Sequence, residues 1–172
     1  MGKRWAQNLV ESLLPLAGEL SYKFGTVTRP LVLYVEDDLQ NFEVAELRLG
    51  KRYQLLHALD DLTACQLLEQ HRDELTAVLM DIELKGSTLD GLALTRQLRG
   101  KGAADAPDYA KKVTARRTPI FIVTAYVGQY PPALLAEAGA DNSFTKPVDF
   151  VKLSLALATA SAKAAIGLFD KP

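Results

Sequence analysis

The stretch LVLYVEDD, residues 31–38, decides the fold of this chain. In it, five apolar or aromatic residues lead directly into three acids. Two later runs end in the same way: AVLM (77–80) is followed by Asp81, and IFIV (120–123) by Thr124. Short apolar runs that alternate with helical patterning are typical of buried parallel strands.

Strand and helix patterns alternate along the chain on both sides of the acids at 36–38. We predict strands near 31–35, 53–58, 76–81, 119–124 and 141–145, and helices near 39–49, 61–72, 90–99, 131–138 and 148–166. Five such units predict an α/β domain, a doubly wound parallel sheet over residues 31–168. The flavodoxin-like strand order 2-1-3-4-5 is the usual one for five units.

Residues 1–30 form an N-terminal extension and linker ahead of this domain. Within it, apolar residues recur every three to four positions, which predicts an amphipathic helix over 4–20. Two alternatives stay open for its apolar stripe: packing on its own domain, or docking to a partner or a second copy in a homodimer.

Composition restricts the function classes. The 172 residues carry a net charge of −1, which gives no argument for a nucleic-acid or anionic-membrane partner. No apolar stretch is long enough to span a bilayer, and the single cysteine, Cys65, predicts a reducing, cytoplasmic location. Cys65 and His57 are predicted to pack as ordinary structural residues. The basic stretch 100–118 is predicted to be a solvated loop that could hold one helical turn, with a docking patch as the alternative.

Acids at the ends of neighbouring parallel strands converge at one edge of the sheet. Glu36, Asp37 and Asp81 would therefore form a carboxylate cluster that suits Mg²⁺, whereas Asp38 is expected to cap the following helix. Lys146 follows the last strand and could neutralise a phosphoryl oxygen, and the Thr124 hydroxyl could bind one.

Six short motifs occur in order: VEDD (35–38), MDIEL (80–84), DG (90–91), IVTA (122–125), GAD (139–141) and KP (146–147). In this series the chain resembles the receiver domain of bacterial two-component response regulators, over about residues 31–167. The resemblance implies that Asp81 accepts a phosphoryl group from a sensor histidine kinase or a histidine phosphotransfer protein.

The resemblance also implies roles for the other site residues. Asp37 would bind Mg²⁺ directly, Glu36 through a metal-bound water, and Glu83 through its backbone carbonyl. Thr124 would bind a phosphoryl oxygen after phosphorylation, and Lys146 would bridge the phosphoryl group and a carboxylate. The peptide bond between Lys146 and Pro147 is expected to be cis.

This chain departs from the receiver pattern in three places. Ser143 stands where receivers usually carry an aromatic residue that transmits phosphorylation, and strand alternation directs Phe144 to the opposite face. Tyr126 could cover part of that role. The loop 85–89 is slightly longer than usual and lacks a common proline. Glu83 and Tyr126 would border the phosphoryl group and hinder water, which predicts slow hydrolysis.

The sequence therefore predicts a phosphorylatable receiver that relays a signal by binding another protein. A scaffold with the receiver fold that no longer uses phosphorylation is the alternative, favoured by Ser143. A metal-dependent phosphatase is a third class, because Asp81-Ile82-Glu83 faintly resembles the start of a phosphatase motif.

Overall fold

A parallel sheet forms the centre of the computed structural model, which describes residues 29–125 and 128–165. Its strands are β1 (Leu31–Val35), β2 (Gln54–Ala58), β3 (Leu75–Met80), β4 (Ile120–Thr124) and β5 (Asn142–Thr145). The helices are α2 (Leu39–Leu49), α3 (Asp61–Gln70), α4 (Gly91–Leu98), α5 (Asp108–Lys111), α6 (Pro132–Ala138) and α7 (Phe150–Ala165). Except for α5, which was not among the predicted elements, these bounds agree with the prediction to within two residues.

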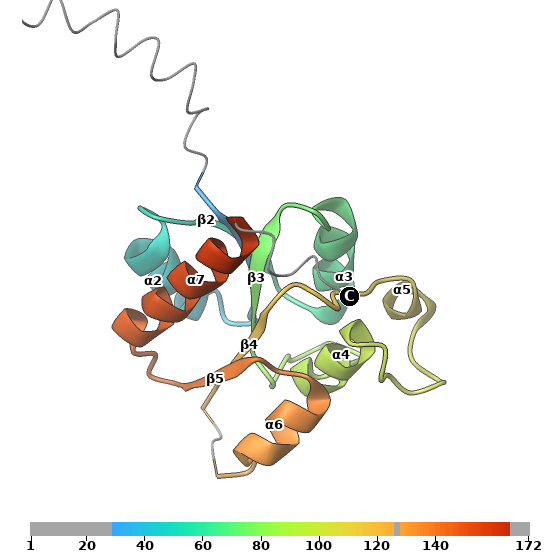
Figure 1. Ribbon diagram of the computed structural model, residues 1–172. Coiled ribbons are helices and arrows are strands. Elements are labelled where there is room, and N and C mark those ends of the chain that lie inside the picture. The colour runs from blue at the N-terminus through green and yellow to red at the C-terminus, as the bar shows by residue number, and fades with distance from the viewer. Residues whose placement is uncertain (1–28, 126–127, 166–172) are drawn as a thin grey trace, which may run out of the picture.

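The strand order is β2-β1-β3-β4-β5, and every pair is parallel, which confirms the flavodoxin-like prediction (Figure 1). β1 lies between β2 and β3, with Val35 beside Ala58 on one side and Met80 on the other. Because the strands run the same way, the residues that follow β1, β3, β4 and β5 reach one edge of the sheet.

Apolar side chains cover both faces of the sheet. On one face, α2 and α7 pack on β1, β3 and β4 through buried residues such as Leu49, Leu79 and Leu157. On the other face, α3, α4 and α6 pack through residues such as Leu68, Leu94 and Leu135. Both faces are thus buried, as a doubly wound sheet requires.

Aspartates begin the helices nearest the carboxyl edge. The side chains of Asp38, Asp60 and Asp90 accept hydrogen bonds from the N–H groups of Gln40, Thr63 and Ala93, at 2.8, 2.7 and 2.7 Å. Each carboxylate satisfies an amide that the helix leaves unpaired. The predicted capping role of Asp38 is confirmed.

The stretch 100–118 holds a short helix, α5, between two loops. Its buried residues Ala110, Val113 and Ala115 join the apolar cluster on the α3 side of the sheet. This stretch is therefore packed onto the domain through its apolar side chains, while its lysines and arginines stay exposed. Cys65 is also buried in this cluster, as predicted, and burial raises the pKa of its thiol to about 12.

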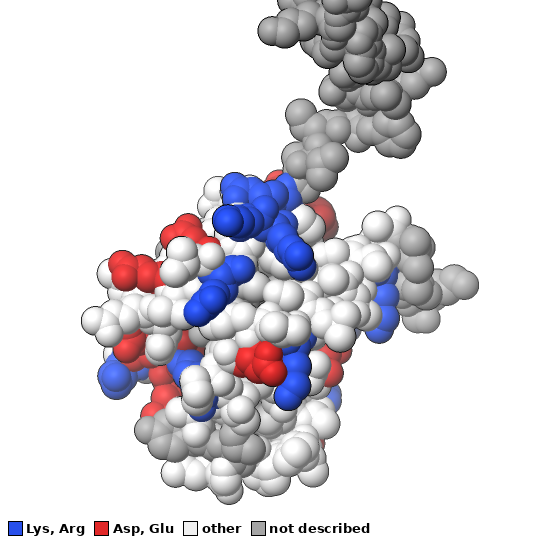
Figure 2. Space-filling model, turned by 90° about the vertical axis from the view of Figure 1, so that its left-hand side faces the viewer, with Lys and Arg blue, Asp and Glu red and all other residues white. Residues whose placement is uncertain are grey.

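The side of the molecule at the left of Figure 1 is seen directly in Figure 2, where basic side chains gather at the upper end above a largely uncharged area. Helices α2 and α7 leave five large apolar side chains exposed: Leu39, Val44, Leu47, Val151 and Leu155.

No helix within residues 29–125 and 128–165 is long and apolar enough to cross a membrane. The predicted N-terminal helix over 4–20 lies outside the described residues.

Candidate functional site

Three carboxylates meet at the carboxyl edge of the sheet. Glu36 and Asp37 directly follow β1, and Asp81 directly follows β3. One oxygen from each lies within 4.8 Å of the others, and Glu36 and Asp81 are 0% and 5% exposed. The structure thus brings together the three acids that the sequence predicted to converge.

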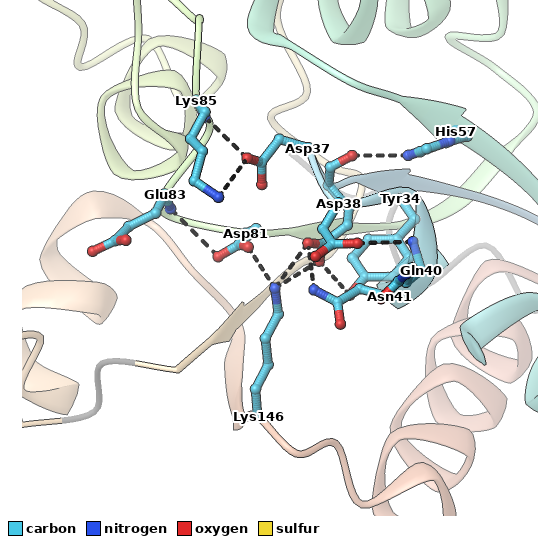
Figure 3. A network of polar contacts seen from close by, with 11 residues as sticks. Tyr34, Asp37, Asp38, Gln40, Asn41, His57, Asp81, Glu83, Lys85 and Lys146 are labelled. Carbon is cyan, nitrogen blue, oxygen red and sulfur yellow. Dashed lines mark hydrogen bonds and ion pairs between the residues drawn. The ribbon is translucent and has the colours of Figure 1, made fainter. Parts of the chain in front are cut away.

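Lys146 closes this cluster from the end of β5 (Figure 3). Its ammonium lies 2.5 Å from Asp81 Oδ2 and 2.7 Å from Glu36 Oε2. The Lys146 N–H also donates to the Thr124 carbonyl at 2.9 Å, which ties the lysine to the end of β4. The peptide bond between Lys146 and Pro147 is cis, as predicted.

The cluster holds more negative than positive charge. Burial raises the pKa of Asp81, and the nearby Glu36 raises it further, whereas the hydrogen bond and charge of Lys146 lower it; the net direction is upward. Burial alone would lower the pKa of Lys146, but its hydrogen bonds to Asp81 and Glu36 raise it, so the ammonium stays charged. Three carboxylates against this ammonium leave a net charge of about −2, which a divalent cation would balance.

Two residues that the sequence analysis did not predict orient Glu36. The Tyr34 hydroxyl donates to Glu36 Oε2 at 2.8 Å, and the Asn41 amide donates to Glu36 Oε1 at 2.9 Å. Burial and the neighbouring Glu36 raise the pKa of Tyr34, so its hydroxyl remains a donor. Strand alternation could have indicated this contact, because residues two apart on a strand share a face.

Asp37 lies nearer the solvent, at the side of an open cleft of about 540 Å³. Lys85 approaches it from the loop after Asp81: the Lys85 N–H donates to Asp37 Oδ2 at 3.3 Å, and the ammonium lies 3.7 Å from the same oxygen. The Lys85 side chain is 87% exposed, so this ion pair is weak and can give way to a metal ion.

Glu83 contacts the site through its backbone. Its N–H donates to Asp81 Oδ1 at 3.4 Å, while its exposed side chain points away from the cluster (Figure 3). The carbonyl of Glu83 as a metal ligand remains a prediction.

Thr124 ends β4 and is 2% exposed, which places it at the same edge of the sheet as Asp81. On β5, Ser143 is exposed and Phe144 packs on Phe121 on the opposite face, with ring centroids 6.0 Å apart. The predicted direction of Phe144 is thus confirmed, and Ser143 leaves its position without an aromatic ring. Tyr126 lies outside the described residues.

His57 serves packing, as predicted. Its ring stacks on Phe42 with centroids 4.0 Å apart, and its Nε2 lies 2.8 Å from the Glu36 carbonyl oxygen. It therefore supports the backbone beside the cluster and does not enter it.

The fold and the site define a class of protein: a five-stranded parallel α/β domain with buried acids and a lysine at the carboxyl edge. Solved structures of that class resemble this chain. The receiver domain of the sensor histidine kinase PA1611 from Pseudomonas aeruginosa, solved with magnesium in its active-site cleft, is 29% identical with a TM-score of 0.58, covering 74% of this chain and 93% of that domain. A putative response regulator from Chloroflexus aurantiacus is 25% identical with a TM-score of 0.60, covering 78% and 99%.

Among curated proteins, the response regulator PleD of Caulobacter vibrioides is 30% identical over 123 residues, which is 71% of this chain. The chain spans about a quarter of the length of PleD, 24%. No family model matches the chain. The chain is a receiver domain of the response-regulator type, as the sequence motifs predicted.

Proposed function

We propose that this receiver accepts a phosphoryl group on Asp81 and relays the signal by binding another protein. One observation carries the proposal: the Asp81 carboxylate lies 2.5 Å from the Lys146 ammonium within a cluster of three acids. Residues 31–168 would form the phosphorylated unit, and residues 1–30 its extension.

The chain's own groups fit a phosphoryl transfer. An Asp81 oxygen would attack phosphorus and form an O–P bond while the bond from phosphorus to the donor histidine nitrogen breaks, leaving its electron pair on that nitrogen. Lys146 would neutralise charge on the transferred group, because its ammonium already reaches the Asp81 oxygen. Thr124 would donate its hydroxyl to a phosphoryl oxygen afterwards.

Glu36, Asp37 and Asp81 are the residues that would hold Mg²⁺, with the Glu83 carbonyl as a further ligand. Hard cations prefer such oxygen donors, and the excess negative charge favours a divalent ion. Bound Mg²⁺ would stabilise the negative charge that develops on the transferred group. The magnesium in the PA1611 receiver supports this assignment.

The donor would be a sensor histidine kinase or a histidine phosphotransfer protein, and the output a downstream protein. Besides gaining and losing its own phosphoryl group, the chain would turn over no small molecule. A cytoplasmic location remains a proposal from the single cysteine.

Acetyl phosphate with Mg²⁺ tests the proposal. Intact mass spectrometry should show the mass of one added phosphoryl group in the wild type and none in Asp81→Asn. Asp38→Asn is the matched control, because asparagine still caps α2 and Asp38 lies outside the acid cluster. It should be phosphorylated like the wild type. A mass gain in Asp81→Asn would overturn the assignment of the acceptor.

A scaffold that does not use phosphorylation is the second candidate. The exposed Ser143, in place of an aromatic, favours it. A wild type that neither gains mass nor responds to a beryllofluoride mimic with Mg²⁺ would support the scaffold. Hydrolysis of a generic phosphomonoester would instead support a phosphatase.

The N-terminal extension keeps its two alternatives. The exposed apolar side chains of α2 and α7 offer a surface to this segment or to a second copy. Removing residues 1–24 and measuring the mass in solution separates them, since only a dimer held by this segment would fall to half its mass.

A further inference from the structure

A buried carboxylate that the proposed reaction does not use lies beside the loop that follows Asp81. Asp61, the first residue of α3, is 2% exposed. Residues 83–90, which belong to the connection between β3 and α4 and are hereafter the acceptor loop, run past it. Because an ionised carboxylate is costly to bury without donors, its partners indicate what holds it there.

The partners of Asp61 come from the acceptor loop. Asp61 Oδ1 accepts from the N–H of Thr88 at 3.3 Å, and Oδ2 accepts from the N–H of Leu89 at 2.9 Å. The N–H of Asp61 donates to the Ser87 hydroxyl at 3.2 Å. Three consecutive loop residues are thus bound to one residue of α3.

A residue of α5 completes the arrangement. The Tyr109 hydroxyl donates to Asp61 Oδ2 at 2.6 Å, from 48 positions along the chain. Burial and this hydrogen bond raise the pKa of Tyr109, so the hydroxyl keeps its proton and continues to donate. Asp61 therefore joins α3, α5 and the acceptor loop.

Both ends of the acceptor loop meet the site. At its start, Glu83 and Lys85 donate their N–H groups to Asp81 and Asp37. At its end, the N–H of Gly91 donates to the Ile82 carbonyl at 2.8 Å, and a Cβ at Gly91 would lie 1.8 Å from the Asp81 carbonyl oxygen. Between these two points, residues 87–89 of the loop are bound to Asp61.

We propose that Asp61 is a positioning residue, braced by the Tyr109 hydroxyl, that fixes the acceptor loop so that its backbone meets Asp37 and Asp81 in the geometry that binds Mg²⁺. The proposal rests on the proposed function, because it assigns Mg²⁺ to that site. It makes α5 part of the support of the site, although α5 lies outside the acid cluster.

Tyr109→Phe and Asp61→Asn test this positioning role in the full chain. Tyr109→Phe removes one hydroxyl and keeps the ring. In Asp61→Asn, the amide nitrogen cannot accept the hydrogen bonds that one of the two carboxylate oxygens now accepts. We expect the amides of Thr88 and Leu89 to exchange about tenfold faster, the effect of losing one hydrogen bond of about 1.4 kcal/mol. Calorimetric titration should show Mg²⁺ binding weakened by about three- to tenfold.

Tyr53→Phe is the matched control, because the Tyr53 hydroxyl donates to the Ser154 carbonyl at 3.4 Å on the other face of the sheet. It should leave both the exchange rates and the affinity for Mg²⁺ unchanged. Urea unfolding verifies that each variant is folded, and Tyr109→Phe decides alone if Asp61→Asn is not.

Unchanged exchange at Thr88 and Leu89 in Tyr109→Phe would overturn the bracing of Asp61 by the Tyr109 hydroxyl. Unchanged exchange in Asp61→Asn would overturn the contact of Asp61 with the loop. Faster exchange with an unchanged affinity for Mg²⁺ would overturn the positioning role. A wild type that binds no Mg²⁺ would refute the proposed metal site itself and with it the positioning role, whereas the exchange rates would still report whether Asp61 holds the loop.

Discussion

The central strands β1 and β3 differ from the edge strand β5 in nearly every respect. All residues of β1 and β3 are buried, whereas three of the four residues of β5 are exposed. β1 and β3 lead into acids that the fold encloses, and β5 leads into Lys146, whose side chain is 17% exposed. The proposed acceptor and the proposed metal-binding acids thus follow strands of the core, and the lysine follows a strand at the margin of the sheet.

Under the proposed function, receiving a phosphoryl group and transmitting its arrival would therefore depend on different parts of the sheet. The residues proposed to receive the phosphoryl group are fixed by burial and hydrogen bonds, as the contacts of Glu36 show. In the receiver pattern, an aromatic residue on the last strand is expected to transmit the signal, and this chain has the exposed Ser143 there. A protein can therefore keep the first part intact while the second changes.

Removing the Lys146 ammonium, which pairs with the buried acids, should have the largest effect on stability. Lys146→Met leaves Glu36 and Asp81 buried without their ammonium, and we expect the free energy of unfolding to fall by about 3 kcal/mol without Mg²⁺. Added Mg²⁺ should restore part of it. Urea unfolding measures both. The control, Lys152→Met, removes an exposed lysine of α7 and should change it by less than about 0.5 kcal/mol. An equal loss of stability in the two variants would mean that the ion pairs of Lys146 with buried acids contribute no more than the exposed ion pair of Lys152.

On β5 itself, the two neighbouring residues should behave in opposite ways. Phe144→Ala removes a half-buried ring that packs on Phe121 and should lower the free energy of unfolding by about 2 kcal/mol. Ser143→Ala should change it by less than about 0.5 kcal/mol, because this side chain is exposed. Urea unfolding of both variants measures the difference. If Ser143→Ala lowered the free energy of unfolding as much as Phe144→Ala, side chains on both faces of β5 would have to be packed.

The smallest expected effect is a gain in stability on replacing Asp81. The pKa of Asp81 in the folded chain is raised above 3.8, so the folded chain takes up a proton more readily than the unfolded chain. Its ionised form therefore destabilises the fold at neutral pH, and this penalty disappears as the pH falls through the raised pKa. Asp81→Asn should raise the free energy of unfolding by about 1 kcal/mol at neutral pH without Mg²⁺.

Urea unfolding of wild type and Asp81→Asn, compared between about pH 3.5 and pH 7, checks this expectation, because the penalty is lost as the pH falls toward the ordinary pKa of an aspartate. The difference between the two proteins should shrink toward the acid end. A difference that grows with acid would mean that Lys146 lowers the pKa of Asp81 more than burial raises it.

Local patterns in the sequence predicted most of this architecture. The buried strand 31–35 and the helix 39–49 were predicted with their observed bounds. Apolar periodicity and the cap at Asp38 depend only on residues that are neighbours in the sequence. Strand ends and topology then sufficed to bring Glu36 and Asp81 together.

Contacts between distant residues could not be predicted in this way. Asp61 looks like any acid that begins a helix, and Tyr109 lies in a stretch predicted to be a solvated loop. Their hydrogen bond depends on how α5 packs on α3, which no local pattern encodes. The contact from Tyr34 to Glu36 could have been predicted, since Tyr34 lies on β1 and Glu36 directly follows the strand, two residues further on.

The burial of Cys65 has a practical consequence. Its thiol is enclosed in the core with a pKa of about 12, so at neutral pH it is almost entirely protonated and reacts poorly with alkylating reagents. It is the single cysteine of the chain. A fluorescent or spin label could therefore be attached to a cysteine introduced at the exposed position 143 without first removing the native one, and the label would report motion at the place where the usual aromatic is absent.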